Sequence, residues 1–141
     1  MPIRPAGRND ALRAMPVLQV VDVTSSEAFY TGRLGFDSHG LWGEGGGPAD
    51  FCIVQRGVVT IALDRSRDGT VPLNQYWAAY VYVDDADALH AEYRDNGVEI
   101  VRGPEDMPYG CRDFDIRDPD GHLIAFGHDR SPGKASAPGL A

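Results

Sequence analysis

Aromatic and acidic side chains stand at positions in this 141-residue sequence where they can line a site for a small molecule. Flat heteroaromatic groups stack on aromatic rings, and cationic groups are attracted both to ring faces and to carboxylates. These residue types therefore favour a cationic, aromatic ligand. No nucleophile stands beside a base, so no catalytic residue is predicted. The candidate ligand-binding residues are Trp42, Glu44, Phe51, Tyr80, Tyr82, Tyr109, Asp113 and Asp115.

Two alternatives stay open for these candidates. About half of the rings are expected to fill the core, as Phe29, Phe36 and Phe126 should. Asp113 and Asp115 flank Phe114 on one face of a strand, where each is free to meet a ligand or to pair with Arg112 or Arg117 across a hairpin.

The elements that must position these residues come as a repeat. Residues 17–36 and 79–98 each read as an apolar strand, an acidic turn, a helix of about three turns and a glycine that stops it. A duplicated unit of this kind indicates two modules that build one cavity. Thr24 and Glu27 match a capping box for the first helix, and Asp84 or Asp85 caps the second.

The full pattern predicts an α+β fold of two βαβββ modules, in which a helix covers one face of each curved four-stranded sheet. The other, concave face must be covered by the second module or by another chain. The glycine-rich segment 43–48 and the segment 103–110 read as loops, and Asp118-Pro-Asp-Gly121 as a tight turn. The predicted strands are residues 15–21, 36–42, 51–54, 58–63, 76–83, 98–101, 111–117 and 122–127.

Composition excludes several partners and sets the boundaries. The formal net charge is −8 and no basic cluster occurs, so nucleic acid and anionic membranes are not expected partners. Cys52 and Cys111 lack a CxxC pattern and are expected to be buried, reduced thiols in a cytoplasmic protein. Residues 1–13 are predicted to be a flexible arm and residues 130–141 a disordered tail. Between them lies one domain, residues 14–129, with modules 14–64 and 76–129.

Four segments carry a resemblance to a known family. Taken in order and at these intervals, they resemble the vicinal oxygen chelate superfamily, which is the glyoxalase/bleomycin-resistance/dioxygenase group, over about residues 15–128. The resemblance implies the glyoxalase/bleomycin resistance/dihydroxybiphenyl dioxygenase-like fold. The segments are Pro16–Asp22, Phe29–Phe36, Val83–Leu89 and Asp113–Ile124.

Metal-dependent members of this superfamily place a His at the start of each module's first strand and a Glu in each module's last strand. Counting from the shared segments puts these positions at Met15, Ile61, Ala78 and Ala125, with Ala62 replacing Ile61 if the register slips. None of these side chains binds a borderline or hard divalent ion. His39 is the one histidine expected to point into the cavity. The resemblance therefore implies no metal and no other cofactor.

Within the superfamily, the sequence most resembles the bleomycin-resistance proteins, through Pro16 and the segments Pro72–Val83 and Met107–Gly121. That likeness implies a homodimer with two clefts, in which a bleomycin-like antibiotic is sequestered without a metal and resistance follows. The alternative is a metal-dependent glyoxalase- or dioxygenase-type enzyme. A metal-free enzyme that uses Tyr109 or a carboxylate for acid–base chemistry is a further alternative.

Overall fold

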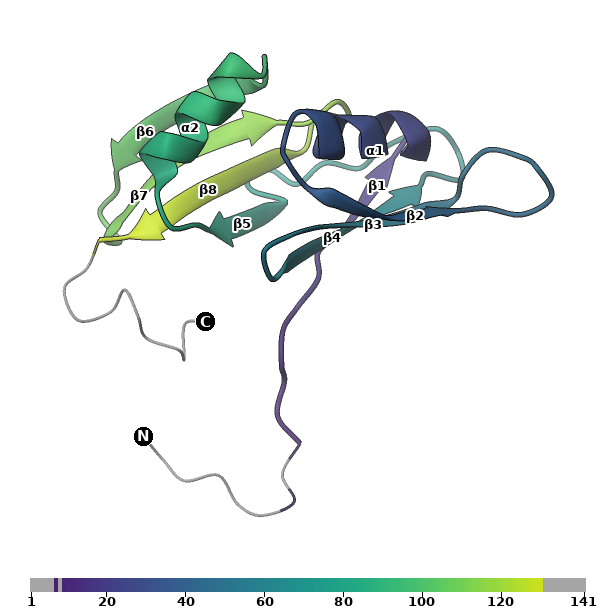
Figure 1. The fold of residues 1–141 in the computed structure, drawn as a ribbon, viewed down its shortest axis with the longest axis horizontal. Helices are drawn as coiled ribbons and strands as arrows, with labels where there is room; N and C mark the ends of the chain where they lie inside the picture. The colour runs from purple at the N-terminus through teal and green to yellow at the C-terminus, as the bar shows by residue number, and fades with distance from the viewer. Residues whose placement is uncertain (1–6, 8, 131–141) are drawn as a thin grey trace.

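The computed structural model describes residue 7 and residues 9–130, which form two four-stranded sheets with one helix against each (Figure 1). The predicted disordered tail lies outside the described residues except for Arg130, and so does much of the predicted arm. The described part of the arm contains no helix or strand, and Leu12 within it is exposed. No helix in residues 9–130 is long and apolar enough to cross a membrane.

The first module contains β1 (Val17–Val20), α1 (Val23–Gly32), β2 (Asp37–Trp42), β3 (Phe51–Arg56) and β4 (Val59–Arg65). The second contains β5 (Ala79–Tyr82), α2 (Ala86–Asp95), β6 (Glu99–Asp106), β7 (Cys111–Arg117) and β8 (Leu123–Asp129). The first sheet has the order β1-β4-β3-β2, and the second sheet repeats it as β5-β8-β7-β6. In each sheet the first strand is parallel to the last, and the other pairs are antiparallel. The predicted pair of βαβββ modules is confirmed.

Each helix begins at an aspartate. The carboxylates of Asp22 and Asp85 accept hydrogen bonds from the backbone N–H groups of Ser25 and Ala88, which would otherwise lack partners at the helix start. Asp85 was one of the two caps expected. The capping box of Thr24 and Glu27 is wrong, because Asp22 already caps the helix two residues earlier and Thr24 lies inside its first turn.

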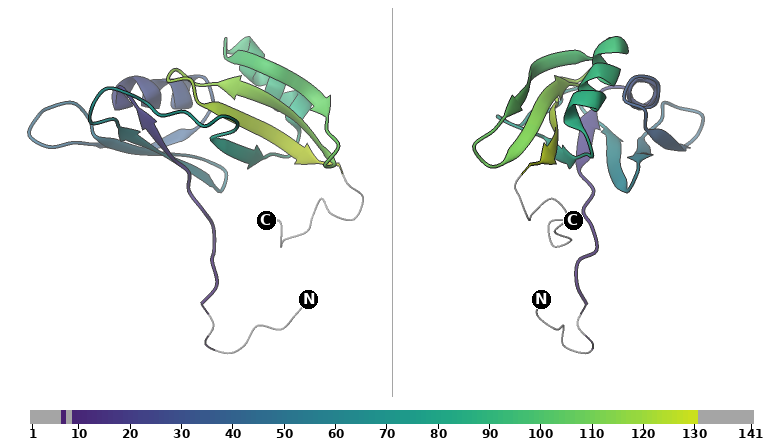
Figure 2. Two further views of the ribbon diagram at one scale, coloured as in Figure 1. Left: turned by 180° about the vertical axis from the view of Figure 1, so that it is seen from behind. Right: turned by 60° about the vertical axis from the view of Figure 1, so that its left-hand side comes forward.

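Alternate residues of each strand point toward the helix or away from it. Under α1 the core contains Leu18, Val20, Cys52, Val54, Ile61 and Leu63, and under α2 it contains Val81, Phe114, Ile116, Ile124 and Phe126. Cys52 and Cys111 are free and buried, as expected. The residues between these core positions form the face of each sheet that carries no helix, which we call its open face (Figure 2).

The modules are tied together at their helices. Tyr30 and Tyr93 are the eighth residues of α1 and α2 and are fully buried. Tyr30 donates a hydrogen bond to Asp118 Oδ2 of the second module at 2.8 Å, and Tyr93 donates one to the carbonyl of Leu34 in the first module at 2.9 Å. Because each tyrosine reaches into the other module, the repeat fixes how the two sheets sit side by side.

One element differs from the prediction in a way that matters for the site. Strand β6 runs to Asp106, through part of the segment read as a loop. Its pairing with β7 shifts register between Ile100 and Arg102 and again between Arg102 and Glu105. These irregularities let the strand pass Gly103 and Pro104, and they place Arg102 opposite Asp115.

Candidate ligand-binding faces

The eight predicted ligand-binding residues belong to two sets. Trp42 and Phe51 lie on the first sheet and Glu44 follows it in the exposed loop after β2. The second set belongs to the second module. The two sheets are not packed against each other, so the described chain does not bring both sets into one cleft. The second set consists of Tyr80, Tyr82, Tyr109, Asp113 and Asp115.

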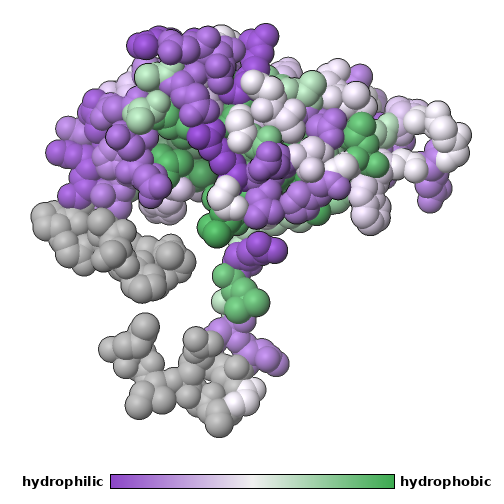
Figure 3. All heavy atoms as spheres, viewed as in Figure 1, coloured by the Kyte–Doolittle hydropathy of each residue, from purple (hydrophilic) through white to green (hydrophobic). Residues whose placement is uncertain are grey.

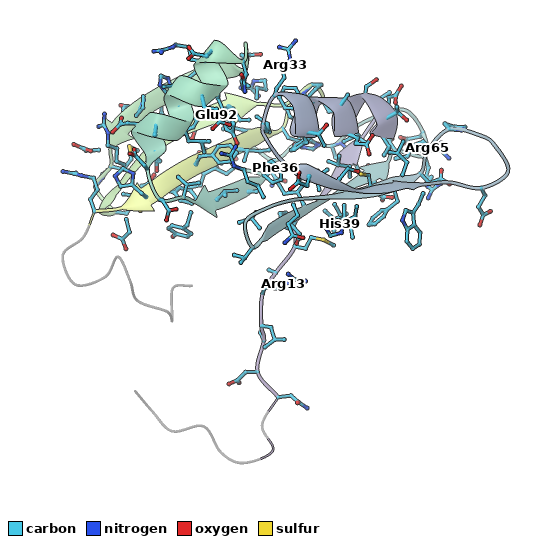
Figure 4. All side chains as sticks on the ribbon, viewed as in Figure 1. Arg13, Arg33, Phe36, His39, Arg65 and Glu92 are labelled. Atoms are coloured by element: carbon cyan, nitrogen blue, oxygen red, sulfur yellow. The ribbon has the colours of Figure 1, made fainter. Side chains whose placement is uncertain are left out.

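The first-sheet face carries a row of rings that ends in a carboxylate. Trp42 pairs with Phe51 across β2 and β3, and Phe51 pairs with Asp64 on β4. Trp42 is 70% exposed. His39 lies on the side of the sheet away from α1, where its Nε2 is 2.9 Å from Gln55 Oε1 (Figure 4). His39 therefore does point to the open face, as predicted.

Sequence reasoning missed Asp64. It sits at the end of an apolar strand, where a carboxylate is easily read as the start of the following loop. The alternation that places Ala62 on the open face places Asp64 there as well. Asp64 is the carboxylate nearest in register to the Trp42–Phe51 pair.

The second-sheet face carries a cluster of four rings, in which the Trp77–Tyr80, Trp77–Tyr109 and Tyr80–Tyr109 contacts are edge to face and the Tyr80–Tyr82 contact is tilted. The Trp77 and Tyr80 ring centres are 4.9 Å apart, and those of Tyr80 and Tyr82 are 5.0 Å apart. Tyr109 lies 6.4 Å from Tyr80 and 6.3 Å from Trp77. The structure thus brings three predicted residues together and adds Trp77. Tyr82 and Tyr109 remain 59% and 47% exposed, which leaves ring surface for a guest.

The acidic residues of this face are not free. Arg102 Nη2 lies 2.5 Å from Asp113 Oδ1 and 2.9 Å from Asp115 Oδ1, and Nη1 lies 3.1 Å from Glu105 Oε1. The alternative of an ion pair was right in kind, but its partners were wrong. Arg102 approaches from β6 on the open face.

Arg112 and Arg117, the two arginines expected as partners, pair with other carboxylates. Arg112 binds Asp87 and Asp106, and Arg117 lies 3.8 Å from Glu99. Arg112 alternates with the aspartates along β7 and therefore points away from them. Arg117 is on the same face as the aspartates but ends the strand, and there it donates a hydrogen bond to the carbonyl of Gly121.

Hydroxyl and indole donors complete the network around the two aspartates. Tyr80 donates to Asp113 Oδ2 at 2.8 Å, and Tyr109 donates to the same oxygen. Trp77 Nε1 donates to Asp115 Oδ1 at 3.1 Å. No described buried side-chain N or O atom lacks a hydrogen-bond partner, so the polar groups of this network are all satisfied.

This network sets the charge states of its members. Burial alone would raise the pKa of Asp113, but the hydrogen bonds from Tyr109, Arg102 and Tyr80 outweigh it and hold the pKa below its usual value. Burial and the neighbouring Asp113 raise the pKa values of Tyr80 and Tyr109. Asp113 is therefore ionised and both phenols keep their protons, which makes Tyr109 a poor general base.

Three of the four metal-ligand positions predicted from the resemblance fall on the open faces, and the fourth, Ile61, does not. Ala125 lies opposite Tyr80 on the second sheet, and Ala62 lies opposite Val17 on the first. Ile61 instead packs in the core under α1, so of the two predicted alternatives Ala62 is the one on the open face. Met15 and Ala78 continue the alternation of Val17 and Tyr80. These side chains do not fit a metal, and no three His, Cys, Asp or Glu residues within the described chain are grouped to hold one.

A separate hollow lies between the modules. It has a volume of about 440 Å³ and is lined by residues of α2, β5 and the β3–β4 turn. Figure 3 shows apolar residues between the polar surface of α2 and the tip of that turn. Tyr82 is its only lining residue among the predicted ligand-binding residues, so this hollow is distinct from the two open faces.

Comparison with known proteins agrees with the fold. The model of the Glyoxalase/Bleomycin resistance protein/Dioxygenase superfamily matches residues 13–126. The bleomycin-binding protein from bleomycin-producing Streptomyces verticillus, solved with copper(II)-bleomycin, is 28% identical, with a TM-score of 0.66 over 84% of this chain and 97% of that chain. No curated protein matches the sequence.

Two further solved structures share the fold. TioX from Micromonospora sp. ML1 is 21% identical, with a TM-score of 0.69 over 83% of this chain and 98% of that chain. TnmS3, an antibiotic binding protein from Streptomyces sp. CB03234, is 23% identical, with a TM-score of 0.64 over 86% of this chain and 99% of that chain. The chain belongs to the glyoxalase/bleomycin resistance protein/dioxygenase superfamily.

Proposed function

We propose that this member of the superfamily binds and sequesters a small aromatic natural product, of the kind represented by bleomycin, and leaves it chemically unchanged. One observation carries the proposal: rings occupy the open faces, while Met15, Ala62, Ala78 and Ala125 stand where relatives hold a metal. The 28% identity to a protein solved with copper(II)-bleomycin supports the same class of ligand.

A homodimer would complete the binding site. Each open face presents exposed apolar surface, including Trp42 and Val17 on the first sheet and Tyr82 on the second. Contiguous surface of this kind commonly marks an interface or a binding site. If a second copy lays its first-sheet face over the second-sheet face, a twofold axis makes two equivalent clefts, each lined by both sets of rings. Sedimentation equilibrium at micromolar concentration should give twice the chain mass.

Positive charge on the ligand would be met by carboxylates that form an ion pair with no arginine of residues 9–130. Asp64 lies in register beside Phe51, and Glu44 stands in the glycine-rich loop that follows Trp42. Asp113 and Asp115 already hold Arg102. In this arrangement the first-sheet face supplies charge and a stacking ring, and the second-sheet face supplies further rings.

The experiment is a titration with metal-free bleomycin, followed by tryptophan fluorescence and by calorimetry. The chain contains two tryptophans, so the W77F variant reports Trp42 alone and the W42F variant reports Trp77 alone. We expect quenching of Trp42 and a dissociation constant in the micromolar range or below, about −8 kcal/mol. Neither quenching nor heat at several hundred micromolar bleomycin would exclude this ligand.

Elemental analysis separates this function from that of a metal-dependent enzyme. Protein purified without chelator should carry far less than one equivalent of zinc, nickel, iron or manganese. A stoichiometric metal that is removed together with a catalytic activity would favour the glyoxalase- or dioxygenase-type alternative.

A further inference from the structure

Arg102 occupies the acidic end of the second-sheet face as a cation supplied by the chain itself. Its guanidinium spans Asp113 and Asp115, and its Nε also donates to Asp115 Oδ2 at 3.1 Å. Asp113 is fully buried, whereas the Arg102 side chain is 25% exposed. The arginine therefore covers the two carboxylates from the solvent side.

The surroundings of Arg102 resemble a ligand subsite. Trp77, Tyr80 and Tyr109 donate to the oxygens of the same two aspartates, and their rings stand around them. A planar cation between two carboxylates and beside aromatic rings is the arrangement that recognises amidinium and guanidinium groups. In this chain the cation between the two carboxylates is the guanidinium of Arg102.

A ligand cannot easily take over this place. A free cation that displaced Arg102 would exchange one charge-assisted pair for another and gain little. The side chain is tethered, so it competes at an effective concentration of millimolar or more at every ligand concentration. Removing the guanidinium without a replacement would leave two buried carboxylates unpaired, which is strongly unfavourable.

We propose that Arg102 is the specificity-determining residue of the second-sheet face: it fills the cation place between Asp113 and Asp115, so this face selects guests by their rings and not by their positive charge. The inference rests on the proposed binding function for its biological meaning, but the occupied subsite can be tested without bleomycin.

The test compares benzamidine with benzamide, its uncharged isostere, on full-length protein. Binding is followed by Trp77 fluorescence in the W42F background, where Trp77 is the only tryptophan. The wild-type protein should bind benzamidine and benzamide with nearly equal affinity. In the R102Q variant, whose amide still donates to a carboxylate, we expect the benzamidine-to-benzamide affinity ratio to rise about tenfold or more and to fall again at high salt. R102A should show the same gain and should also bind ethylguanidine, which reproduces the deleted part of the side chain.

Arg112 provides the matched control. It makes two carboxylate pairs from strand β7, beside Asp113 in sequence but on the other face. R112Q should leave the affinity ratio unchanged. An unchanged ratio in R102Q, or a gain of equal size in R112Q, would overturn the inference.

The wild-type protein gives an independent decision if the Arg102 variants do not fold. A wild type that prefers benzamidine at least tenfold, with the preference lost in D113N, would show that a free cation reaches the aspartates past Arg102. A ratio near one supports the inference. Loss of bleomycin binding in every form would count against the proposed function and would leave this result standing.

Discussion

Replacing Gly127 by alanine probes how tightly the second-sheet face is built. Gly127 lies in β8 opposite Asp113, and the Tyr80 hydroxyl rests directly over its Cα. A Cβ at this position would collide with the Tyr80 oxygen and come within 2.7 Å of Asp113 Cβ. The backbone of β8 is held on both sides by β5 and β7, so the Tyr80 ring must move.

The expected loss of stability follows from what that movement breaks. Tyr80 loses its hydrogen bond to an ionised carboxylate, which contributes about 1.5–3 kcal/mol. Overpacking adds about 1–3 kcal/mol, and the smaller conformational freedom of alanine in the unfolded chain returns about 0.4–1 kcal/mol. We expect G127A to lower the free energy of unfolding by about 2–5 kcal/mol.

Urea denaturation followed by circular dichroism measures this change. The matched control is G32A at the end of α1, where a Cβ meets nothing within 4 Å and a helical alanine should be neutral or stabilising. Because Y80F removes the colliding oxygen, the Y80F/G127A double variant should be at least about 1 kcal/mol more stable than the sum of the single changes predicts. Additive effects, or a G127A protein as stable as the wild type, would refute this reasoning.

Three further predictions concern the network and the contacts between modules. Y30F should lower the free energy of unfolding by about 1–3 kcal/mol in urea denaturation, because it removes a buried hydrogen bond to Asp118 across the modules. The pKa of Asp113 is lower in the folded protein than in the unfolded chain, where it is about 3.9. The ionised carboxylate therefore stabilises the folded state above that pH, and this stabilisation is lost as the pH falls. D113N should lose less stability than the wild type between pH 5 and pH 2 in thermal melts. E92Q should cost under about 1 kcal/mol, since the pair between Glu92 and Arg56 is about 40% exposed; a larger loss would mean that this pair locks the modules.

The repeat made the fold predictable from the sequence. Two copies of a strand, an acidic turn and a helix fixed the element order, and the glycines at Gly35 and Gly97 marked the ends of both helices. Local rules were less reliable where two residues competed for one role: Asp22 and Thr24 are both good helix caps, and only the backbone geometry selects Asp22.

The sequence predicted on which face of the sheet the two aspartates lie, but not which residues they contact. Alternation along β7 correctly placed Asp113 and Asp115 on one face. Their partner Arg102 was hidden because it reaches them only through the irregular pairing of β6, within and beside a stretch that reads as a loop. Trp77 was not among the eight candidates for a related reason: it precedes β5, and its ring turns back onto Tyr80.

The metal-ligand positions show how a single step of register changes a side chain's surroundings. Ile61 and Ala62 are neighbours in β4, yet one packs in the core under α1 and the other lies on the open face. Counting from Gly57 gave the first, and the pairing of Ala62 with Val17 gives the second. Neither residue binds a metal, so the choice alters the geometry of the site and leaves its chemistry unchanged.

A crystal structure of the protein with bleomycin tests the central claim most directly. We expect a guest whose rings lie against Trp42 or Tyr82, with Arg102 still bound to its two aspartates. A metal ion held by protein side chains near Ala62, Ala78 or Ala125 would contradict it.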